Sequence, residues 1–182
     1  MTSPILLISG SNRPGANALR IAKVIEAHYV AQGVPVDLYN LMDMPAEIFS
    51  PTSYATKPPS WEPIQQRVLS AAGLHVITPE YNGSFPGVLK YFVDMLKFPE
   101  SFERKPVAFV GEAAGAWGGL RAVEQLQLVF GYRNAYVFPD RVFIPGVNGK
   151  LNAEGKITDA DLDKRLKTQV TAFTKFATTM SQ

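Results

Sequence analysis

Three short segments of the sequence contain the residue types needed to bind a phosphorylated compound. The first, residues 9–17, reads Ser-Gly-Ser-Asn-Arg-Pro-Gly-Ala-Asn. If this segment joins a strand to a helix, its backbone N–H groups and those of the helix start form a cradle for an anion. Ser11 and Asn17 would add side-chain donors, and Arg13 would add a charged donor capable of two parallel hydrogen bonds. The alternative is an ordinary strand-to-helix turn whose Gly and Asn residues merely permit tight geometry.

The second and third segments are suited to a flat ring. Residues 78–87 read Thr-Pro-Glu-Tyr-Asn-Gly-Ser-Phe-Pro-Gly, and their amides, the Asn82 side chain and the Tyr81 ring would line the edge of a planar heterocycle. The alternative is a Pro-Gly loop in which Tyr81 and Phe85 simply pack. Residues 111–119 contain four glycines, which allow a ligand to approach the backbone closely. Trp117 is either a wall for ring stacking, which we favour, or a core side chain.

Metal and dinucleotide chemistry fit the sequence poorly. The chain has no cysteine, and its two histidines, His28 and His75, lack the spacing of metal ligands, so we expect no metal site. Gly10 and Gly15 match neither the P-loop nor the dinucleotide-binding fingerprint. Asp37 falls inside an expected strand rather than at its end, where a dinucleotide fold places its ribose-binding acid. NAD bound in the Rossmann manner is therefore disfavoured.

Side-chain catalysis also finds little support. No histidine is placed to activate Ser84 as a nucleophile. Acid–base hydrolysis would have to use Glu80 and Glu112 on neighbouring loops, an alternative that stays open without positive evidence. A phosphate cradle and a polar ring-binding loop without a catalytic side chain favour a bound cofactor that performs the chemistry.

The elements that must position these segments alternate between buried strands and amphipathic helices. Short apolar runs predict strands at residues 4–9, 34–39, 74–78, 106–110 and 135–138. Apolar residues spaced three and four apart predict helices at residues 18–29, 62–72, 88–96, 122–130 and 162–177. We therefore expect an α/β fold with a doubly wound five-stranded parallel sheet and helices on both faces. In a flavodoxin-like order, 2-1-3-4-5, the three segments meet where the strand order reverses.

Local signals set several expected boundaries. Gly131 is expected to end the fourth helix. Thr158 and Asp161 have capping-box spacing, which places the start of the last helix there. Residues 40–60 contain four prolines and are expected to form a long irregular connection.

Composition bounds the remaining possibilities. The 182 residues are 46% hydrophobic and 19% charged, enough to build a core without disulfides, and they contain no linker or repeat. We expect a single domain over residues 1–182. A net charge of +2 gives no reason to expect nucleic-acid binding. The N-terminus has no basic leader and no apolar run approaches ~20 residues, so we expect an intracellular, cytoplasmic protein without membrane insertion.

Taken in order, the three segments resemble the NAD(P)H-dependent FMN reductase family of flavodoxin-like quinone, chromate and azo reductases. Residues 79–90, followed by Asp94, are similar to the family's P-E-Y-N-x-S-x-P-x-x-L-K-N-x-x-D signature. Gly10, Ser11 and Arg13 are similar to its G-S-x-R phosphate loop. The resemblance extends from the first strand to about Pro139.

This resemblance implies an FMN site without a catalytic side chain, because hydride passes through the flavin N5. Ser11 and Arg13 would hold the phosphate, and residues 79–82 would border the isoalloxazine ring and ribityl chain. Backbone N–H groups around Asn82 and Gly115 would face the ring. The full expected cofactor site comprises Ser11, Arg13, Ala16, Asn17, Pro79, Glu80, Tyr81, Asn82, Gly83, Glu112, Ala114, Gly115 and Trp117. The family usually has serine at the position of Ala16, and Asn17 could supply the missing donor.

The resemblance also implies an activity and an assembly. NAD(P)H would reduce bound FMN, and quinones, chromate, azo compounds or free flavin would then take the electrons in a ping-pong reaction. Members of the family form dimers or tetramers, so Tyr91, Phe98 and Phe102 are expected to be exposed at a subunit contact.

Two alternative functions stay open. A flavodoxin-type electron carrier is disfavoured by the net charge of +2, since carriers are usually strongly acidic. A non-catalytic flavin-binding regulatory module, or one that has lost FMN, is favoured only by Ala16.

Overall fold

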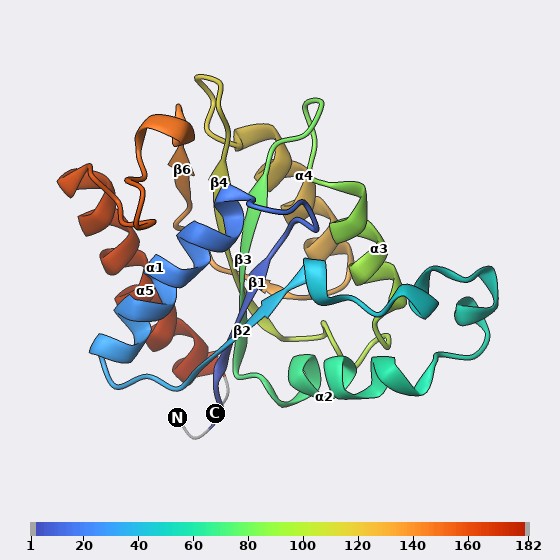
Figure 1. The fold of residues 1–182 in the computed structure, drawn as a ribbon. Helices are drawn as coiled ribbons and strands as arrows, with labels where there is room; N and C mark the ends of the chain where they lie inside the picture. Colours follow the sequence, from blue (N-terminus) through green and yellow to red (C-terminus); the bar gives the residue numbers. More distant parts are fainter. Residues whose placement is uncertain (1–2, 181–182) are drawn as a thin grey trace.

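The computed structural model describes residues 3–180, in which one parallel sheet lies between two layers of helices (Figure 1). The sheet has the order β2-β1-β3-β4-β5, as predicted, and β6 also pairs with β4. Every pairing is parallel. The strands are β1 (Ile5–Ser9), β2 (Val36–Asn40), β3 (Gly73–Pro79), β4 (Pro106–Glu112), β5 (Tyr136–Val137) and β6 (Val142–Ile144).

The helices divide between the two faces of the sheet. Helices α1 (Asn17–Ala31) and α5 (Ala160–Met180) cover one face, and α2 (Glu62–Ser70), α3 (Gly87–Met95) and α4 (Leu120–Tyr132) cover the other (Figure 1). The pleat of β1 shows why its residues 5–8 are all apolar. Ile5 and Leu7 pack into the core beneath α1 and α5, whereas Leu6 and Ile8 pack into the opposite core.

The fifth strand is interrupted, which the sequence did not predict. Residues 136–137 pair with the first part of β4 and residues 142–144 pair with its last part. Between them the chain leaves the sheet edge at Pro139, which has no N–H to donate to a ladder. Phe138, expected in the strand, instead packs in the core with its ring 5.6 Å from that of Phe173. The predicted strand at residues 135–138 is confirmed as β5, and the additional strand β6 is what the sequence did not predict.

Several predicted element ends also differ from the structure. Strands β3 and β4 run on to Pro79 and Glu112, so residues assigned to loops belong to the sheet. Helix α4 passes through Gly131 to Tyr132. At the start of α5 the capping residue is Asp159, whose Oδ1 accepts a hydrogen bond from the Leu162 N–H at 3.1 Å. The predicted pairing of Thr158 with Asp161 is not formed.

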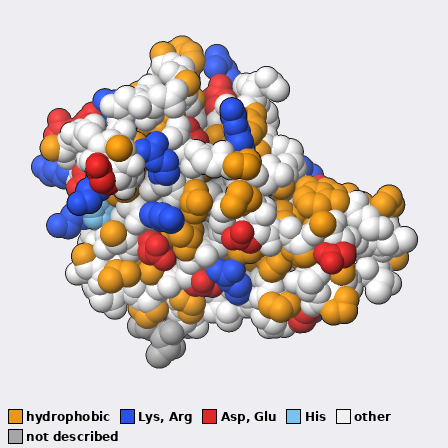
Figure 2. All heavy atoms as spheres, in the orientation of Figure 1, with side chains coloured by type: hydrophobic (Ala, Val, Ile, Leu, Met, Phe, Trp, Pro, Cys, Tyr) orange, Lys and Arg blue, Asp and Glu red, His pale blue; other side chains and the backbone are white. Residues whose placement is uncertain are grey.

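The segment between β2 and α2 projects from the body of the molecule. It contains four short 3₁₀ helices, Leu41–Asp43, Ala46–Phe49, Pro51–Tyr54 and Pro59–Trp61, in place of an irregular loop. Trp61 is buried at its end and anchors it to the core. Figure 2 shows hydrophobic side chains gathered over this lobe, and Met42, Phe49 and Tyr54 are exposed there. The Tyr91 hydroxyl donates to the Ile48 carbonyl at 2.6 Å and so ties the lobe to α3.

Candidate flavin site

A cavity of about 490 Å³ opens at the carboxyl ends of β1, β3 and β4. This is the edge of a doubly wound sheet at which ligands bind, and β1 and β3 flank the point where the strand order reverses. The cavity is lined by Arg13, Pro14, Gly15, Ala16, Asn17, Pro79, Glu80, Tyr81, Glu112, Ala113, Ala114, Val147 and Asn148. All three segments singled out in the sequence therefore contribute to one wall.

Most of the expected site residues lie in this wall, but five do not. Ser11, Asn82, Gly83, Gly115 and Trp117 are absent from the lining. The hydrogen bonds and the backbone geometry of each loop explain why these five residues lie outside the cavity wall.

Ser11 is buried and joins two of the loops. Its Oγ lies 2.8 Å from the Tyr81 hydroxyl and accepts a hydrogen bond from the Arg13 N–H at 3.2 Å. The side chain thus holds the first loop in shape and ties it to the segment after β3. Its effect on a ligand in the cavity passes through Arg13 and Tyr81.

Asn82 and Gly83 form the tip of a tight turn. The N–H of Tyr81 donates to the Ser84 carbonyl at 2.8 Å, and the Ser84 N–H donates back to the Tyr81 carbonyl at 3.1 Å. Both central residues have left-handed φ angles, 52° and 76°, which is the conformation that favours an Asn-Gly pair. Gln125 of α4 holds the turn by bonding the Ser84 hydroxyl at 2.6 Å and the Gly83 carbonyl at 3.0 Å.

Three of the four glycines after β4 serve the packing of the chain itself. A Cβ on Gly119 would lie 2.5 Å from the Glu112 nitrogen, and one on Gly118 would lie 2.7 Å from the Pro145 nitrogen. Gly111 packs equally closely against these two glycines. Only Gly115 faces open space. The interpretation of this segment as backbone open to a ligand therefore holds for Gly115 alone.

Trp117 is a surface residue. It is 60% exposed, and the Arg121 guanidinium carbon lies 5.8 Å from the centre of its ring. The alternative reading of Trp117 as a core side chain is therefore wrong. Arg121 also approaches Glu80, with Nη1 and Oε1 3.4 Å apart.

Five lining residues were not anticipated, and two of them follow the unexpected strand β6. Val147 and Asn148 reach the cavity from a short 3₁₀ helix, Val147–Gly149, which lies in the Gly-containing connection that leads to α5. Asn17 donates from Nδ2 to Asn148 Oδ1 at 3.0 Å, and its own Oδ1 accepts from Arg20 at 3.2 Å. One of the two Asn17 donors is therefore already engaged. The glycines flanking residues 147–148 were the available signal for a turn.

The cavity has polar groups that the protein leaves without full hydrogen bonding. Glu80 Oε2 is buried without a partner. The residue that precedes helix α1 is Ala16, whose side chain provides no cap for the N–H groups of the first turn. Glu112 is only 5% exposed, and burial raises the pKa of its carboxyl to about 7. Buried groups of this kind cost about 1–3 kcal/mol each unless a ligand supplies a partner.

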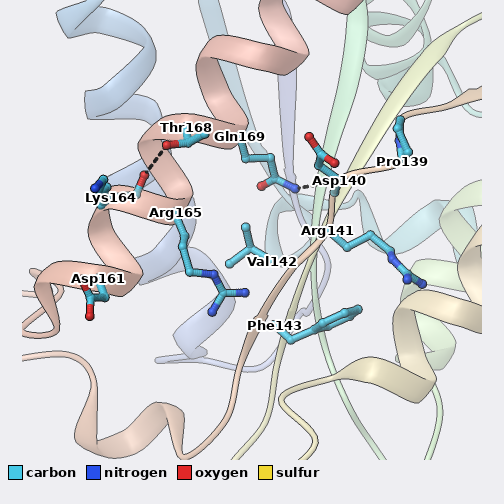
Figure 3. A pocket seen from close by; sticks show the side chains of 10 residues that line it. All are labelled: Pro139, Asp140, Arg141, Val142, Phe143, Asp161, Lys164, Arg165, Thr168 and Gln169. Atoms are coloured by element: carbon cyan, nitrogen blue, oxygen red, sulfur yellow. Dashed lines mark hydrogen bonds between the residues drawn. The ribbon is translucent and has the colours of Figure 1, made fainter.

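A second and larger hollow lies between β6 and α5. It has a volume of about 650 Å³ and is lined by residues 139–143 and by side chains of α5, including Arg165 and Gln169 (Figure 3). Its buried polar group, Gln169, donates to the carbonyls of Phe109 and Asp140 at 3.0 and 2.9 Å and lies 3.3 Å from His75 Nε2. None of the unpartnered buried side-chain atoms within residues 3–180 belongs to this lining.

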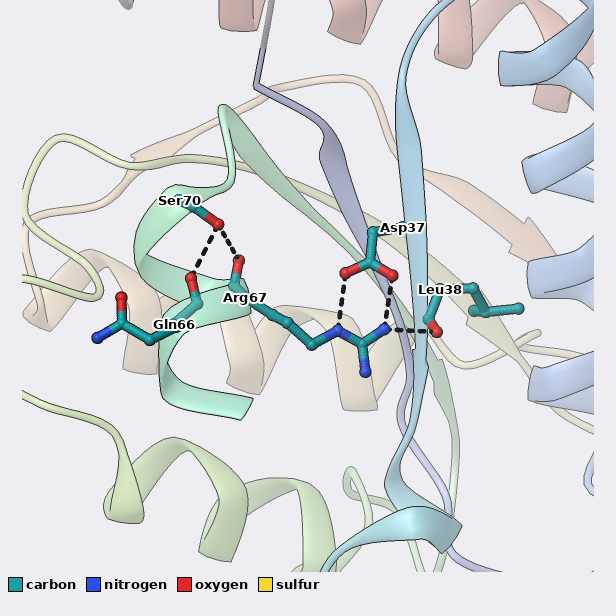
Figure 4. A network of polar contacts seen from close by, with 5 residues as sticks. All are labelled: Asp37, Leu38, Gln66, Arg67 and Ser70. Carbon is teal, nitrogen blue, oxygen red and sulfur yellow. Dashed lines mark hydrogen bonds and ion pairs between the residues drawn. The ribbon is translucent and has the colours of Figure 1, made fainter. Parts of the chain in front are cut away.

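The other ionisable groups considered in the sequence are engaged elsewhere. Asp37 accepts two hydrogen bonds from Arg67, at 2.6 and 2.7 Å, and thereby joins α2 to the edge strand β2 (Figure 4). His28 lies 3.0 Å from Asp163. In the part of the chain that the structure describes, no group of three His, Cys, Asp or Glu side chains is arranged to bind a metal.

The sequence model of the NADPH-dependent FMN reductases matches residues 3–149. The chain belongs to this family. The reductase is therefore an NAD(P)H-dependent flavin oxidoreductase with FMN as its cofactor, as the sequence predicted.

Individual relatives agree with the family assignment. The reductase is 29% identical over 173 residues to an NAD(P)H-dependent FMN reductase of Pseudomonas aeruginosa, covering 92% of this chain and 91% of the relative. It is 30% identical over 148 residues to a 2-hydroxy-1,4-benzoquinone reductase of a Burkholderia species, covering 78% and 81%. A flavoenzyme NAD(P)H:(acceptor) oxidoreductase from Paracoccus denitrificans has the same fold, with a TM-score of 0.82, 22% identity and coverage of 98% and 99%.

Proposed function

We propose that the 490 Å³ cavity is the FMN site and that the reductase passes hydride from NAD(P)H through FMN to quinones or similar acceptors. The observation that carries this proposal is the coincidence of three features in one cavity. They are the start of α1, whose N-cap residue Ala16 provides no capping side chain, the cation Arg13, and the unpartnered oxygen of Glu80.

The end of the cavity at α1 fits the phosphate. The free N–H groups of a helix start and the positive end of its dipole favour an anion. Arg13 lies in the same wall and would add a charge-assisted hydrogen bond. Ala16 has no side-chain donor to offer at this end. The backbone of residues 13–17 and the remaining Asn17 donor would therefore form a larger share of the hydrogen bonds to the phosphate. Ser11 supports the phosphate loop through its bonds to Arg13 and Tyr81.

The opposite end fits the sugar chain and the ring. Glu80 Oε2 needs a donor, which a ribityl hydroxyl would provide. Pro79 and Tyr81 line the wall beside it. Asn82, Gly83, Gly115 and Trp117 lie beyond the wall, and we assign them to the open rim where the ring meets its substrates.

The protein contributes positioning rather than a reacting side chain. FMN, when bound, supplies the hydride-accepting and electron-donating chemistry. The chain orients the cofactor between the three loops, and backbone N–H groups at residues 82–83 and 115 are suited to stabilise negative charge at the ring edge. Neither Glu80 nor Glu112 is needed as an acid–base pair for this reaction.

The acceptors follow from the open rim and from the relatives. A site open on one face discriminates weakly between flat acceptors, and one relative bears the name of a benzoquinone reductase. We therefore propose quinones first, and azo compounds, chromate and free flavin as further acceptors. A flavodoxin-type carrier is the alternative, and the net charge of +2 argues against it.

We further propose that residues 1–182 form one FMN-binding domain that assembles as a homodimer or homotetramer in the cytoplasm, where NAD(P)H is supplied. The exposed aromatic side chains of the lobe, Phe49 and Tyr54, and the nearby exposed Phe98 support an interface. Tyr91 is half-buried beneath Phe49, with ring centres 4.9 Å apart. Phe102, expected in this contact, is fully buried and belongs to the core. Within residues 3–180 no helix has the length and apolarity needed to cross a bilayer.

The reaction is tested by steady-state NAD(P)H oxidation over a panel of quinones, with the flavin-loaded protein and no partner protein. We expect Asn82→Ala to lower the rate of flavin reduction, because Asn82 shapes the turn at the rim. Asn134→Ala is the matched control, since Asn134 also has a left-handed φ, 60°, but lies between α4 and β5. Equal activity of Asn82→Ala and the parent would show that the ring is misplaced. NAD(P)H oxidation that requires an added redox protein would favour the carrier.

A further inference from the structure

Glu112 places a carboxyl inside the end of the cavity that we assign to the phosphate. Ala108 and Val110, the preceding residues on the same face of β4, pack into the core beneath α1 and α5. The alternation of the strand therefore directs Glu112 toward α1. There its carboxyl accepts a hydrogen bond from the backbone N–H of Ala18, in the first turn of the helix.

No cation neutralises this carboxyl. Arg13 lies in the same wall but forms no ion pair, and Glu80 is occupied by Arg121. Arg20 of α1 binds Asn17 and the Asn152 carbonyl, and Lys150 pairs with Asp159 at 2.6 Å. None of the ion pairs within residues 3–180 includes Glu112. The Tyr81 hydroxyl faces Ser11.

One helix start cannot favour two anions at the same place. A carboxylate and a phosphate dianion side by side in a buried site repel strongly, because the local dielectric constant is low. A neutral carboxyl, in contrast, has an O–H that can donate a short charge-assisted hydrogen bond to a phosphate oxygen. Burial already favours the neutral form of Glu112 near pH 7.

We propose that Glu112 binds the FMN phosphate as a neutral acid, donating its proton to a phosphate oxygen, so that FMN binding takes up one proton. The inference rests on the proposed FMN site and adds a specificity: the reductase distinguishes FMN from riboflavin less well as the pH rises. Riboflavin has no phosphate and imposes no such requirement on Glu112.

The test is a set of fluorescence-quenching titrations of the flavin-free protein with FMN and with riboflavin between pH 7 and 9. A phosphate monoester has its second pKa near 6, so FMN stays largely dianionic over this range. For the parent protein we expect FMN affinity to fall about tenfold per pH unit above the midpoint of Glu112, as one linked proton requires. Riboflavin affinity is expected to stay constant. Calorimetry in two buffers should show uptake of about one proton with FMN near pH 8.

Glu112→Gln keeps the shape of the side chain and cannot titrate. We expect its FMN affinity to be independent of pH and its proton uptake to vanish, whereas Glu124→Gln, an equal charge change on the exposed face of α4, should behave like the parent. Retained riboflavin binding by Glu112→Gln shows that the site is folded. A pH-independent FMN affinity in the parent, or a slope that persists in Glu112→Gln, would overturn the inference alone. Absence of FMN binding at every pH would overturn the proposed site as well.

Discussion

Two hollows of the reductase, the one between β6 and α5 and the proposed flavin site, differ in how fully their polar groups are hydrogen-bonded. The larger one, about 650 Å³, has a buried glutamine, Gln169, whose amide bonds two carbonyls and a histidine. The smaller one, about 490 Å³, contains a carboxylate oxygen of Glu80 without a partner. It also contains the start of α1, where Ala16 provides no capping side chain.

This difference in hydrogen bonding indicates which hollow binds a ligand better than the difference in volume does. A buried polar group with all its hydrogen bonds stabilises the fold, whereas one that lacks a partner costs stability and is retained for another reason. By this criterion we propose the smaller hollow as the ligand site, and the wall of the larger one is a structural network that joins α5, β3 and β4. The following predictions test that division.

The largest predicted effect is on the pH dependence of folding stability, through His75 in the hydrogen-bond network around Gln169. Burial lowers the pKa of His75 to about 4 from its ordinary value of 6.5, so the unfolded chain binds more protons than the folded one between these values. The free energy of unfolding should therefore keep its full value above pH 6.5 and fall as the pH decreases toward 4. The expected loss is on the order of 3 kcal/mol, since each pKa unit corresponds to about 1.36 kcal/mol. Urea unfolding at several pH values measures this loss. His75→Gln should remove most of the slope, and an unchanged slope would assign acid sensitivity to other groups.

A second effect is expected in the smaller hollow. Arg13→Ala should weaken FMN binding by about 1.5–3 kcal/mol, the range for a hydrogen bond to a charged group, which is roughly 10- to 150-fold. Riboflavin binding should change little, because Arg13 is assigned to the phosphate. Flavin fluorescence titrations give both affinities, and retention of FMN with parental affinity would contradict the phosphate assignment.

The smallest effect is expected when an arginine of the larger hollow is likewise replaced by alanine. Arg165 is exposed on α5 and forms no ion pair within residues 3–180. Arg165→Ala should change stability by less than about 0.5 kcal/mol and leave FMN affinity unchanged. A marked loss of flavin affinity in this variant, measured in the same titrations, would reverse the assignment of the two hollows.

The sheet order and the meeting of the three loops could be predicted because they depend on local signals. The run from Ile5 to Ile8 is apolar at every position, which is typical of a strand covered on both faces. Once the strands alternate with helices, few topologies remain, and each places the loops after parallel strands at one edge.

The parts that could not be predicted depend on contacts distant in sequence. The break at Pro139 moves residues 142–144 back onto β4, and only then do Val147 and Asn148 reach the cavity. The glycines at 118 and 119 resemble ligand-binding backbone in the sequence, but Gly118 packs against the end of β6 and Gly119 against the end of β4. Phe102 was expected at the surface because its partner Phe130, with ring centres 5.7 Å apart, lies on α4, distant in the sequence.

The hydrogen bond between Ser11 and the Tyr81 hydroxyl has a consequence for how this enzyme can be altered. It joins the loop proposed to hold the cofactor's phosphate to the loop proposed to border its ring, so that the two loops are expected to move together. A change of Tyr81 intended to admit a bulkier oxidant would also disturb retention of the prosthetic group. Redesign of substrate range is therefore better directed at Trp117 or the projecting lobe, where side chains are free of that linkage.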